Sequence, residues 1–256
     1  MTEVDLDRAL DVARRALDAA AAAAMKHYDQ GVKVETKPDR SPVTAADRDS
    51  EVAILDVITA AFPEHSILAE ESGKQDKAAD ARWIVDPIDG TRGFTRGGKF
   101  WGALIALELR GEVVIGAMGL PALGDQYWAK KGGGTFKNGA RCRVTAIDAL
   151  ADATVSLGEM GPLLSPPHGD AVTRVVRGAA SARCYGDLKG VAMLLDGLAD
   201  VWLEHGVQPW DLAPTKILLE EAGGRWTTFD GGDSVHEGHA VGSNGPLHDA
   251  VLGMLG

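Results

Sequence analysis

Apolar residues recur at three- and four-residue steps at the start of the chain, on the positions Leu6, Leu10, Ala13, Leu17, Ala20 and Ala24. This spacing predicts one amphipathic helix over residues 3–29, closed by Gly31. A second helix is predicted from Thr44 to Pro63, because Thr44-x-x-Asp47 has the form of a capping box and apolar residues follow on one face. Asp47 then lies in the first turn of that helix.

Two short apolar runs, over residues 66–69 and 82–85, predict strands that lead directly into carboxylates. Glu70 and Glu71 follow the first run, and Asp86 follows the second. Because functional side chains collect at strand ends in α/β folds, these carboxylates are candidates for a site.

The pattern changes near residue 145. Before it, residues 101–109 and 112–118 predict a hairpin about Arg110-Gly111, and residues 127–130 with an Asn138-Gly139 turn predict more antiparallel sheet. After it, strands and helices alternate: strands at 154–157, 200–203, 225–229 and 240–243, and helices at 169–178, 187–197, 210–222 and from about 246. We therefore expect an α/β fold with an α+β N-terminal half (1–145) and an α/β C-terminal half (146–256). No repeat or linker separates the halves, so they should form one compact unit.

Composition and charge narrow the function classes. The 256 residues are 45% hydrophobic and 25% charged, which is ordinary globular usage and excludes a disordered chain. A net charge of −11 disfavours nucleic-acid partners, and no apolar run is long enough to span a membrane. Acidic residues run through the Ala-rich start, so we expect a cytoplasmic protein rather than a secreted one. Cys142 and Cys184 are expected to be reduced packing thiols.

The segment from Trp83 to Thr91 carries the richest chemistry. A buried strand leads into a tight turn in which Pro87 restricts the backbone, so that Asp86 and Asp89 can converge. Gly90 lets backbone amides approach an anion closely, and a helix-like start after Thr91 adds partial positive charge. One turn thus offers ligands for a cation and a cradle for an anion.

These residues resemble the inositol monophosphatase superfamily of magnesium-dependent phosphatases. The resemblance rests on Asp86-Pro-Ile-Asp-Gly-Thr91, the upstream Glu70-Glu71, the downstream Trp210-Asp211, and the segment from Lys37 to Asp47. It implies a layered α/β/α/β/α sandwich of the inositol monophosphatase and fructose-1,6-bisphosphatase type, and a homodimer. It also implies that the metal ligands are Glu70, Asp86, the carbonyl of Ile88, Asp89 and Asp211. Glu71, Asp47 and Thr91 fall at accessory and water-activating positions.

Electrostatics also calls for cations at this site. Two carboxylates ~4 Å apart repel by roughly 4 kcal/mol at an effective dielectric constant near 20, so several gathered together need counter-charge. Oxygen ligands select hard ions, and Mg²⁺ is expected. The family resemblance implies about two to three of these ions per site. The expected reaction is direct attack of metal-activated water on phosphorus. Thr91 and Asp47 would orient and deprotonate this water, Glu70 would assist, and Gly90 and Thr91 would bind the phosphate.

Further motifs resemble the histidinol-phosphate phosphatase branch of this superfamily. They include Thr91 to Gly97, in which Arg92-Gly93 stands where Lys-Asn is common, Arg183-x-Tyr185-Gly186-Asp187, Trp210 to Ala213, and Ser243 to Asp249. Histidinol phosphate carries an ammonium group and an imidazole, so acidic side chains should face it. The candidate substrate-binding residues are Asp187, Glu204, Arg183 and Asp211. An inositol monophosphatase or a broad-specificity sugar-phosphate phosphatase is the alternative.

Several features have simpler explanations. Asp211 and Asp47 could each serve only to cap a helix, and Glu70-Glu71 could be a solvated pair. The segment from Gly93 to Lys99 mimics a phosphate-binding loop but lacks its Ser or Thr, and His236-x-x-His239 is expected to be a surface feature. Trp101, Trp128 and Trp202 are expected in the core or an interface. A metal- or phosphate-binding module without catalysis is the alternative from another class.

Overall fold

The computed structural model describes residues 4–28, 34–36 and 42–256. The first two predicted helices are present as α1 (Leu6–Tyr28) and α2 (Ala45–Ala61). Thr44 caps α2: its hydroxyl accepts a hydrogen bond from the amide of Ala46, and its own amide donates to Asp47 Oδ2 over 2.7 Å, which confirms the capping box. Gly31, the expected end of the first helix, and residues 37–41 of the motif from Lys37 to Asp47 lie outside the described residues.

The larger of the sheets has eight strands in the order β10-β9-β8-β7-β6-β5-β3-β4. Their bounds are β3 (Ser66–Ala69), β4 (Gly73–Gln75), β5 (Ala81–Asp89), β6 (Gly102–Leu109), β7 (Glu112–Leu120), β8 (Asp125–Lys130), β9 (Gly134–Lys137) and β10 (Ala140–Arg141). The β6–β7 hairpin turns at Arg110 and Gly111, with φ of 52° and 84°, which confirms the predicted turn. A separate antiparallel pair joins β1 (Val34–Thr36) and β2 (Pro42–Thr44).

Strand β5 is longer than the sequence predicts. Residues 86–89 were expected in a tight turn, but they continue the strand to Asp89. The register against β6 shifts between Asp86 and Asp89, so the strand is irregular where these carboxylates stand. The chain turns only at Gly90, whose φ is +82°, and then begins the short helix α3 (Thr91–Phe94). The convergence of the two aspartates therefore comes from a bulged strand end rather than from a free turn.

The smaller sheet has five strands in the order β12-β11-β13-β15-β14. They are β11 (Thr154–Leu157), β12 (Ser181–Cys184), β13 (Val201–His205), β14 (Arg225–Thr227) and β15 (His239–Ser243). Strand β12 was not predicted, because its sequence Ser-Ala-Arg-Cys lacks an apolar pattern. It lies at the edge of the sheet, where a strand needs little apolar surface.

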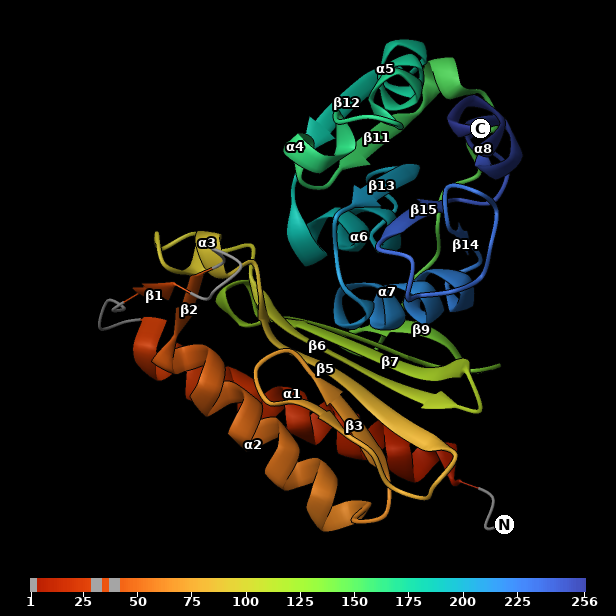
Figure 1. Cartoon of the computed structure of the whole chain (residues 1–256). Helices are drawn as coiled ribbons and strands as arrows, with labels where there is room; N and C mark the ends of the chain where they lie inside the picture. The colour runs from red at the N-terminus through yellow and green to blue at the C-terminus, as the bar shows by residue number, and fades with distance from the viewer. Residues whose placement is uncertain (1–3, 29–33, 37–41) are drawn as a thin grey trace.

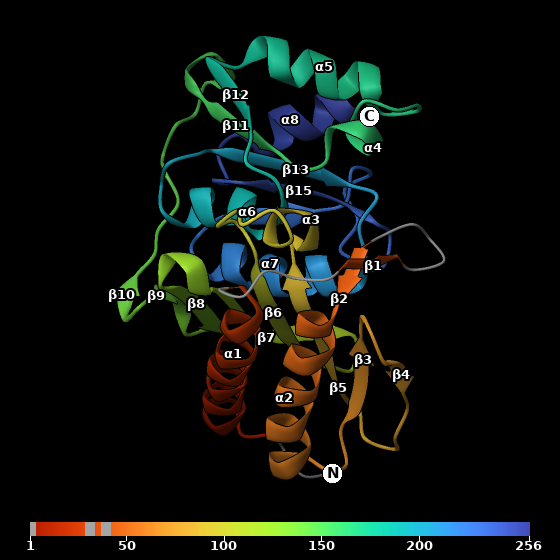
Figure 2. The same cartoon turned by 90° about the vertical axis from the view of Figure 1, so that its left-hand side faces the viewer.

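Helices separate and cover the two sheets (Figures 1 and 2). Besides α1 to α3 they are α4 (Met160–Leu163), α5 (Gly169–Gly178), α6 (Asp187–Leu195), α7 (Pro209–Glu221) and α8 (His248–Leu255), with 3₁₀ turns η1 (Pro121–Leu123) and η2 (Leu150–Asp152). Helices α1 and α2 cover the outer face of the large sheet, α6 and α7 lie between the sheets, and α5 and α8 cover the small sheet. The expected layered α/β/α/β/α sandwich is confirmed.

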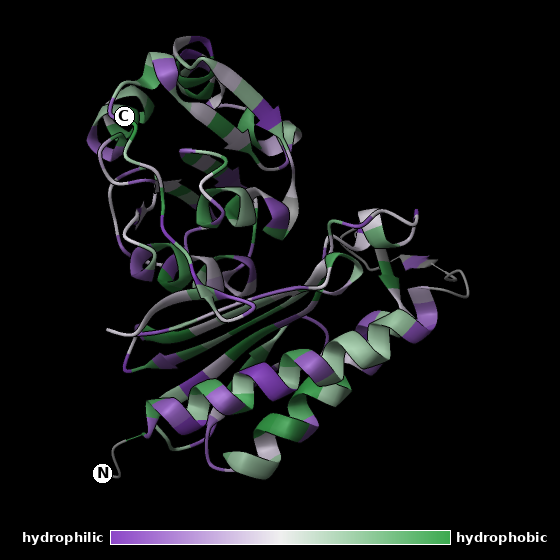
Figure 3. Ribbon diagram, turned by 180° about the vertical axis from the view of Figure 1, so that it is seen from behind, coloured by the Kyte–Doolittle hydropathy of each residue, from purple (hydrophilic) through white to green (hydrophobic). Residues whose placement is uncertain are grey.

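The core between the sheets contains residues of both halves. Ile84 and Leu104 of the large sheet share one buried cluster with Leu212 and Leu218 of α7 and with Trp202 of β13. Figure 3 shows the contrast between these apolar layers and the hydrophilic positions on the outward side of α1.

The division of the chain at residue 145 stays a prediction. Among the helices of the described part of the chain, none has both the length and the apolarity to cross a membrane.

Candidate active site

Three carboxylates meet where the end of β5 lies beside the start of α7. Ligand oxygens of Asp86, Asp89 and Asp211 all lie within 4.8 Å of one another. Asp86 and Asp89 come from the irregular end of β5, and Asp211 comes from the first turn of α7. Asp86 is only 3% exposed. Side chains 125 residues apart in the sequence (211 − 86) are thus brought together by the packing of α7 against the large sheet.

Backbone amides hold each of these carboxylates in place. The amide of Ile88 donates to Asp86 Oδ1 over 2.9 Å, and the amide of Leu188 donates to Asp89 Oδ2. Asp211 Oδ2 accepts from the amide of Gln208 over 2.7 Å, as part of a capping box at the start of α7. Asp211 therefore caps its helix and also faces the cluster, so the capping role does not exclude the predicted ligand role.

The negative charges of the carboxylates in this cluster are destabilised by burial and by one another. Burial raises the pKa of Asp86 well above its ordinary value, and the neighbouring carboxylates of Glu70, Asp211 and Asp89 raise it further. Burial likewise raises the pKa of Asp211 to about 6. A divalent cation would stabilise the charged forms of Asp86 and Asp211. A donor set made of oxygens suits a hard ion such as Mg²⁺. The residues at this site therefore fit the metal that the sequence predicts.

These carboxylates open into a cavity of about 940 Å³. Of the predicted site residues, the cavity is lined by Glu70, Asp86, Ile88, Asp89, Gly90, Thr91, Glu204 and Asp211. The lining comes from strand β5, the start of α3, strand β13 and the start of α7, so segments far apart in the sequence build this cavity. The structure brings together the predicted metal and phosphate residues with two of the four predicted substrate residues, Glu204 and Asp211.

Thr91 connects this cavity to a carboxylate behind it. Its hydroxyl lies 3.2 Å from Asp47 Oδ1 and 3.0 Å from the carbonyl oxygen of Ile88, and it can donate to either. Asp47 is 1% exposed, and its other oxygen accepts from the amide and hydroxyl of Thr44. Asp47 is therefore a buried partner of Thr91 rather than a wall of the cavity.

The turn that carries Glu70 and Glu71 has an anchor that the sequence analysis missed. The buried carboxylate of Glu51, on α2, accepts from the amides of Glu71 and Ser72, each over 2.8 Å. Glu71 itself does not belong to the lining of the described cavity. A glutamate in a helix gives no local signal for this role, because its partner lies 20 residues further along the chain.

Glu204 forms the wall at the end of β13. The side chain is 4% exposed, and Oε1 lies 3.1 Å from the amide of Glu159 and 3.2 Å from that of His205, which both donate to it. Asp187 is the first residue of α6, and its side chain lies outside the described part of the structure. Arg183 is exposed on β12 and donates to the carbonyl of Ala182, away from the lining of the described cavity. Substrate binding by Asp187 and Arg183 stays a prediction.

Several lining residues were not predicted. Arg92, Gly158, Glu159, Cys184 and Trp202 also line the cavity. Cys142 is buried as expected, but Cys184 is exposed, which corrects its assignment as a packing thiol; its Sγ donates to the carbonyl of Gly158 over 3.1 Å. The reason is that Cys184 ends an edge strand beside the cavity, where no layer covers it.

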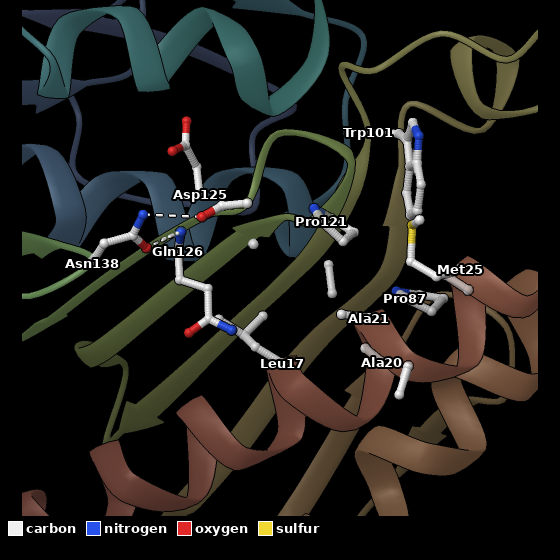
Figure 4. A pocket seen from close by; sticks show the side chains of 15 residues that line it. Leu17, Ala20, Ala21, Met25, Pro87, Trp101, Pro121, Asp125, Gln126 and Asn138 are labelled. Carbon is white, nitrogen blue, oxygen red and sulfur yellow. Dashed lines mark hydrogen bonds between the residues drawn. The ribbon is translucent and has the colours of Figure 1, made fainter. Parts of the chain in front are cut away.

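A second cavity, of about 390 Å³, lies between α1 and the large sheet (Figure 4). Its wall is mainly apolar and includes Leu17, Met25, Pro87 and Trp101. The polar groups at its rim already bond one another: Asn138 accepts from the amide of Gln126 and donates to the carbonyl of Gly124. Among its described lining residues this cavity lacks a cluster of ligating groups like the one at the larger cavity.

A second group of possible ligands, Asp230, Glu237 and His239, lies near the end of β15. Both acidic residues are exposed, and Nδ1 of His239 accepts from the amide of Phe229 over 3.1 Å, which places the proton of a neutral imidazole on Nε2. His236 is a surface residue as predicted, whereas His239 is partly buried and contacts the ring of Phe229. We assign no site to this group.

A two-sheet sandwich with carboxylates from β5 and α7 at one cavity has the fold and donor groups of a protein that can hold divalent cations. More narrowly, the chain belongs to the inositol monophosphatase family, whose model matches residues 5–253. It is 37% identical over 229 residues to the histidinol-phosphatase of Mycobacterium tuberculosis, covering 88% of each chain. It is 36% identical over 228 residues to that of Chlorobaculum parvum, covering 89% of this chain and 88% of the other.

Among solved structures, the inositol monophosphatase of Anabaena superposes with a TM-score of 0.87 at 29% identity, covering 98% of this chain and 96% of the other. The resemblance inferred from the sequence motifs is thereby confirmed, both for the family and for the fold. The chain is a phosphatase rather than a binding module without catalysis.

Proposed function

We propose that the protein hydrolyses L-histidinol phosphate to L-histidinol and phosphate, in a Mg²⁺-dependent reaction of histidine biosynthesis. The observation that carries this proposal is the buried Glu204 carboxylate in the same cavity as Asp86, Asp89 and Asp211. One end of the cavity is suited to metal ions and phosphate, and the Glu204 wall is suited to a cationic group. The histidinol-phosphatase relatives support the same substrate.

The residues that would hold Mg²⁺, about two to three ions, are Glu70, Asp86, the carbonyl of Ile88, Asp89 and Asp211. When bound, Mg²⁺ supplies positive charge for the phosphate oxygens and lowers the pKa of a coordinated water. The amides of Gly90 and Thr91, at the turn into α3, would donate to the phosphate. Support for this assignment comes from the oxygen-only donor set and from the raised pKa values of Asp86 and Asp211.

The proton path would run from the attacking water to Thr91 and Asp47. Thr91 Oγ1 accepts a hydrogen bond from the water and donates its own proton toward Asp47 Oδ1, while Glu70 assists from the cavity side. The water oxygen forms a new bond to phosphorus, and the bond from phosphorus to the ester oxygen breaks, with no phosphorylated enzyme. The leaving alkoxide would form near Asp211 and take up a proton from solvent water to give L-histidinol.

Glu204 would bind the ammonium group of histidinol phosphate, with Asp187 as a second acidic partner. Oε1 of Glu204 is already oriented by the amides of Glu159 and His205, so the side chain loses little conformational freedom when substrate binds. Arg183 and Asp211 complete the proposed substrate-binding set.

The second candidate is an inositol monophosphatase or a broad-specificity sugar-phosphate phosphatase. The fold likeness to the Anabaena enzyme favours it, and carboxylates also accept hydrogen bonds from sugar hydroxyls. The deciding experiment compares kcat/KM for L-histidinol phosphate and for inositol 1-phosphate in Mg²⁺, with chelator as control. A clear preference for inositol 1-phosphate would reject the first proposal.

We also infer a homodimer from the family resemblance. Light scattering coupled to size exclusion measures this directly, since a monomer has a mass of 26.9 kDa. A single peak at the monomer mass would contradict the inference.

A further inference from the structure

The carboxylate of Glu204 occupies the space that a side chain at residue 158 would need. A Cβ built on Gly158 would lie 1.8 Å from Oε2, 1.9 Å from Oε1 and 2.0 Å from Cδ of Glu204. Real Cβ atoms do not approach other atoms this closely, so any side chain at 158 and the present position of Glu204 exclude each other. The absence of a side chain at Gly158 is therefore a condition for the shape of this cavity wall.

The backbone around Gly158 is held on both sides, so it cannot readily yield. Its amide donates to the carbonyl of Leu203 over 2.9 Å, and its carbonyl accepts from Cys184 Sγ over 3.1 Å. The next amide, that of Glu159, donates to Glu204 itself. Gly158 is also not among the glycines of positive φ, so alanine fits the backbone conformation there. The flexible end of Glu204 is what must move when a Cβ is added.

Movement of this carboxylate would cost the bonds that orient it. Oε1 accepts from two amides within 3.2 Å, and the side chain is 4% exposed. A displaced carboxylate loses these donors and stands at a different point of the wall that faces the substrate. A charge-assisted bond to a substrate cation depends on distance and direction, so its strength falls with the displacement.

We propose that Gly158 is a positioning residue that sets the preference of the enzyme for phosphate esters carrying an amine, because it provides the space in which Glu204 meets the substrate cation. This inference rests on the proposed function. It concerns the leaving-group end of the substrate only, so it predicts a change in substrate binding and no change in the bond-breaking step.

The test measures kcat and KM of Gly158→Ala on L-histidinol phosphate and on its analogue without the amine, 3-(imidazol-4-yl)propyl phosphate. We expect KM for histidinol phosphate to rise about tenfold, KM for the analogue to stay within about twofold, and kcat to stay within about twofold on both. Gly253→Ala is the control for a glycine-to-alanine change as such: Gly253 lies on α8, outside the lining of the cavity, and a Cβ there meets nothing within 4 Å. Its KM values should match those of the wild type.

A double-variant cycle separates this mechanism from general damage. In a Glu204→Ala background the space is empty, so adding Gly158→Ala should change neither KM nor the melting temperature. If Gly158→Ala has the same effect with and without Glu204, or raises KM equally for both substrates, the inference is wrong although the enzyme is a histidinol-phosphatase. If the wild type does not hydrolyse histidinol phosphate at all, the proposed function fails and the inference fails with it.

Discussion

The hydroxyl of Thr91 lies 3.2 Å from Oδ1 of Asp47, although 44 positions separate the two residues along the chain. The contact joins the start of α3 to the start of α2. Asp47 uses its other oxygen to accept from the amide and hydroxyl of Thr44, which completes the capping box of α2. One carboxylate thus fixes a helix start and contacts a hydroxyl at the cavity, so the first turn of α2 reaches the candidate active site.

Thr91→Val removes this hydroxyl and keeps the shape of the side chain. If Thr91 passes a proton from water toward Asp47, kcat should fall by about 10²- to 10³-fold, because the general-base contribution is lost. KM should change little, since the backbone amide of residue 91 remains. Steady-state kinetics in Mg²⁺ gives both parameters.

Thr95→Val is the control for this prediction. Thr95 follows α3 and its hydroxyl donates only to the carbonyl of Arg92, over 3.1 Å, among the described contacts. Its kcat should stay within about twofold of the wild type, because no proton-transfer group is removed. An equal loss of kcat in both variants would mean that disturbance of α3, and not the Thr91 hydroxyl, limits the reaction.

Asp86→Asn should stabilise the protein in chelator and abolish stabilisation by Mg²⁺. Burial and the neighbouring carboxylates disfavour the charge on Asp86 without a cation, and Asn can still accept from the amide of Ile88. Each kcal/mol by which the substitution raises the free energy of unfolding should raise the melting temperature by about 2–4 °C. Melting curves with EDTA and with Mg²⁺ measure both effects. Asp249→Asn, at an exposed ion pair with Arg225, is the control, and a Mg²⁺ shift retained by Asp86→Asn would reject the ligand assignment.

His248 should make the protein less stable as the pH falls. This buried histidine bonds Ser243 and Thr227, and burial followed by the charge of Arg225 lowers its pKa to about 4. An unfolded histidine titrates near 6.5, so the unfolded state binds more protons between pH 6.5 and 4, and stability is lost as the pH drops through this window. Between pH 7 and pH 5 the loss should be about 2 kcal/mol.

Urea unfolding at the two pH values measures this loss, and His248→Gln provides the comparison. The variant cannot titrate at this position, so its stability should fall by about 2 kcal/mol less than that of the wild type over the same interval. Parallel losses in the two proteins would show that other groups govern the acid sensitivity.

Gly102→Ala should be severely destabilising. Gly102 pairs with Asp89 across β5 and β6, and a Cβ there would lie 1.6 Å from the carbonyl oxygen of Gly119. Backbone must then move, at a cost of about 3 kcal/mol or more in the free energy of unfolding. Gly119→Ala is the matched control on the facing strand, because its Cβ makes only ordinary contacts with Leu17, and it should stay within about 1 kcal/mol. Similar losses in both variants would contradict this explanation.

The helix and turn signals of this chain are local, and the structure confirms them where local geometry decides. The capping box at Thr44 and Asp47 and the turn at Arg110-Gly111 depend on residues within a few positions of one another. The same local signals predict a turn at residues 86–89. These residues instead continue a strand, because the length of the strand depends on its pairing with β6. It missed β12, whose polar sequence is tolerated only because it lies at a sheet edge.

The sequence by itself determined the family, many of the helices and strands, and the residue types of the candidate site, since the motif from Asp86 to Thr91 with Glu70 and Asp211 carries both the resemblance and the chemistry. Only the tertiary structure decided which groups meet: Thr91 with Asp47, Asp211 with Asp86, and Glu204 with Gly158. The physical reason is the separation along the chain over which each interaction acts. Backbone preferences and caps act over a few residues, whereas burial, charge repulsion and the fit of a carboxylate over a glycine arise only when distant segments pack together.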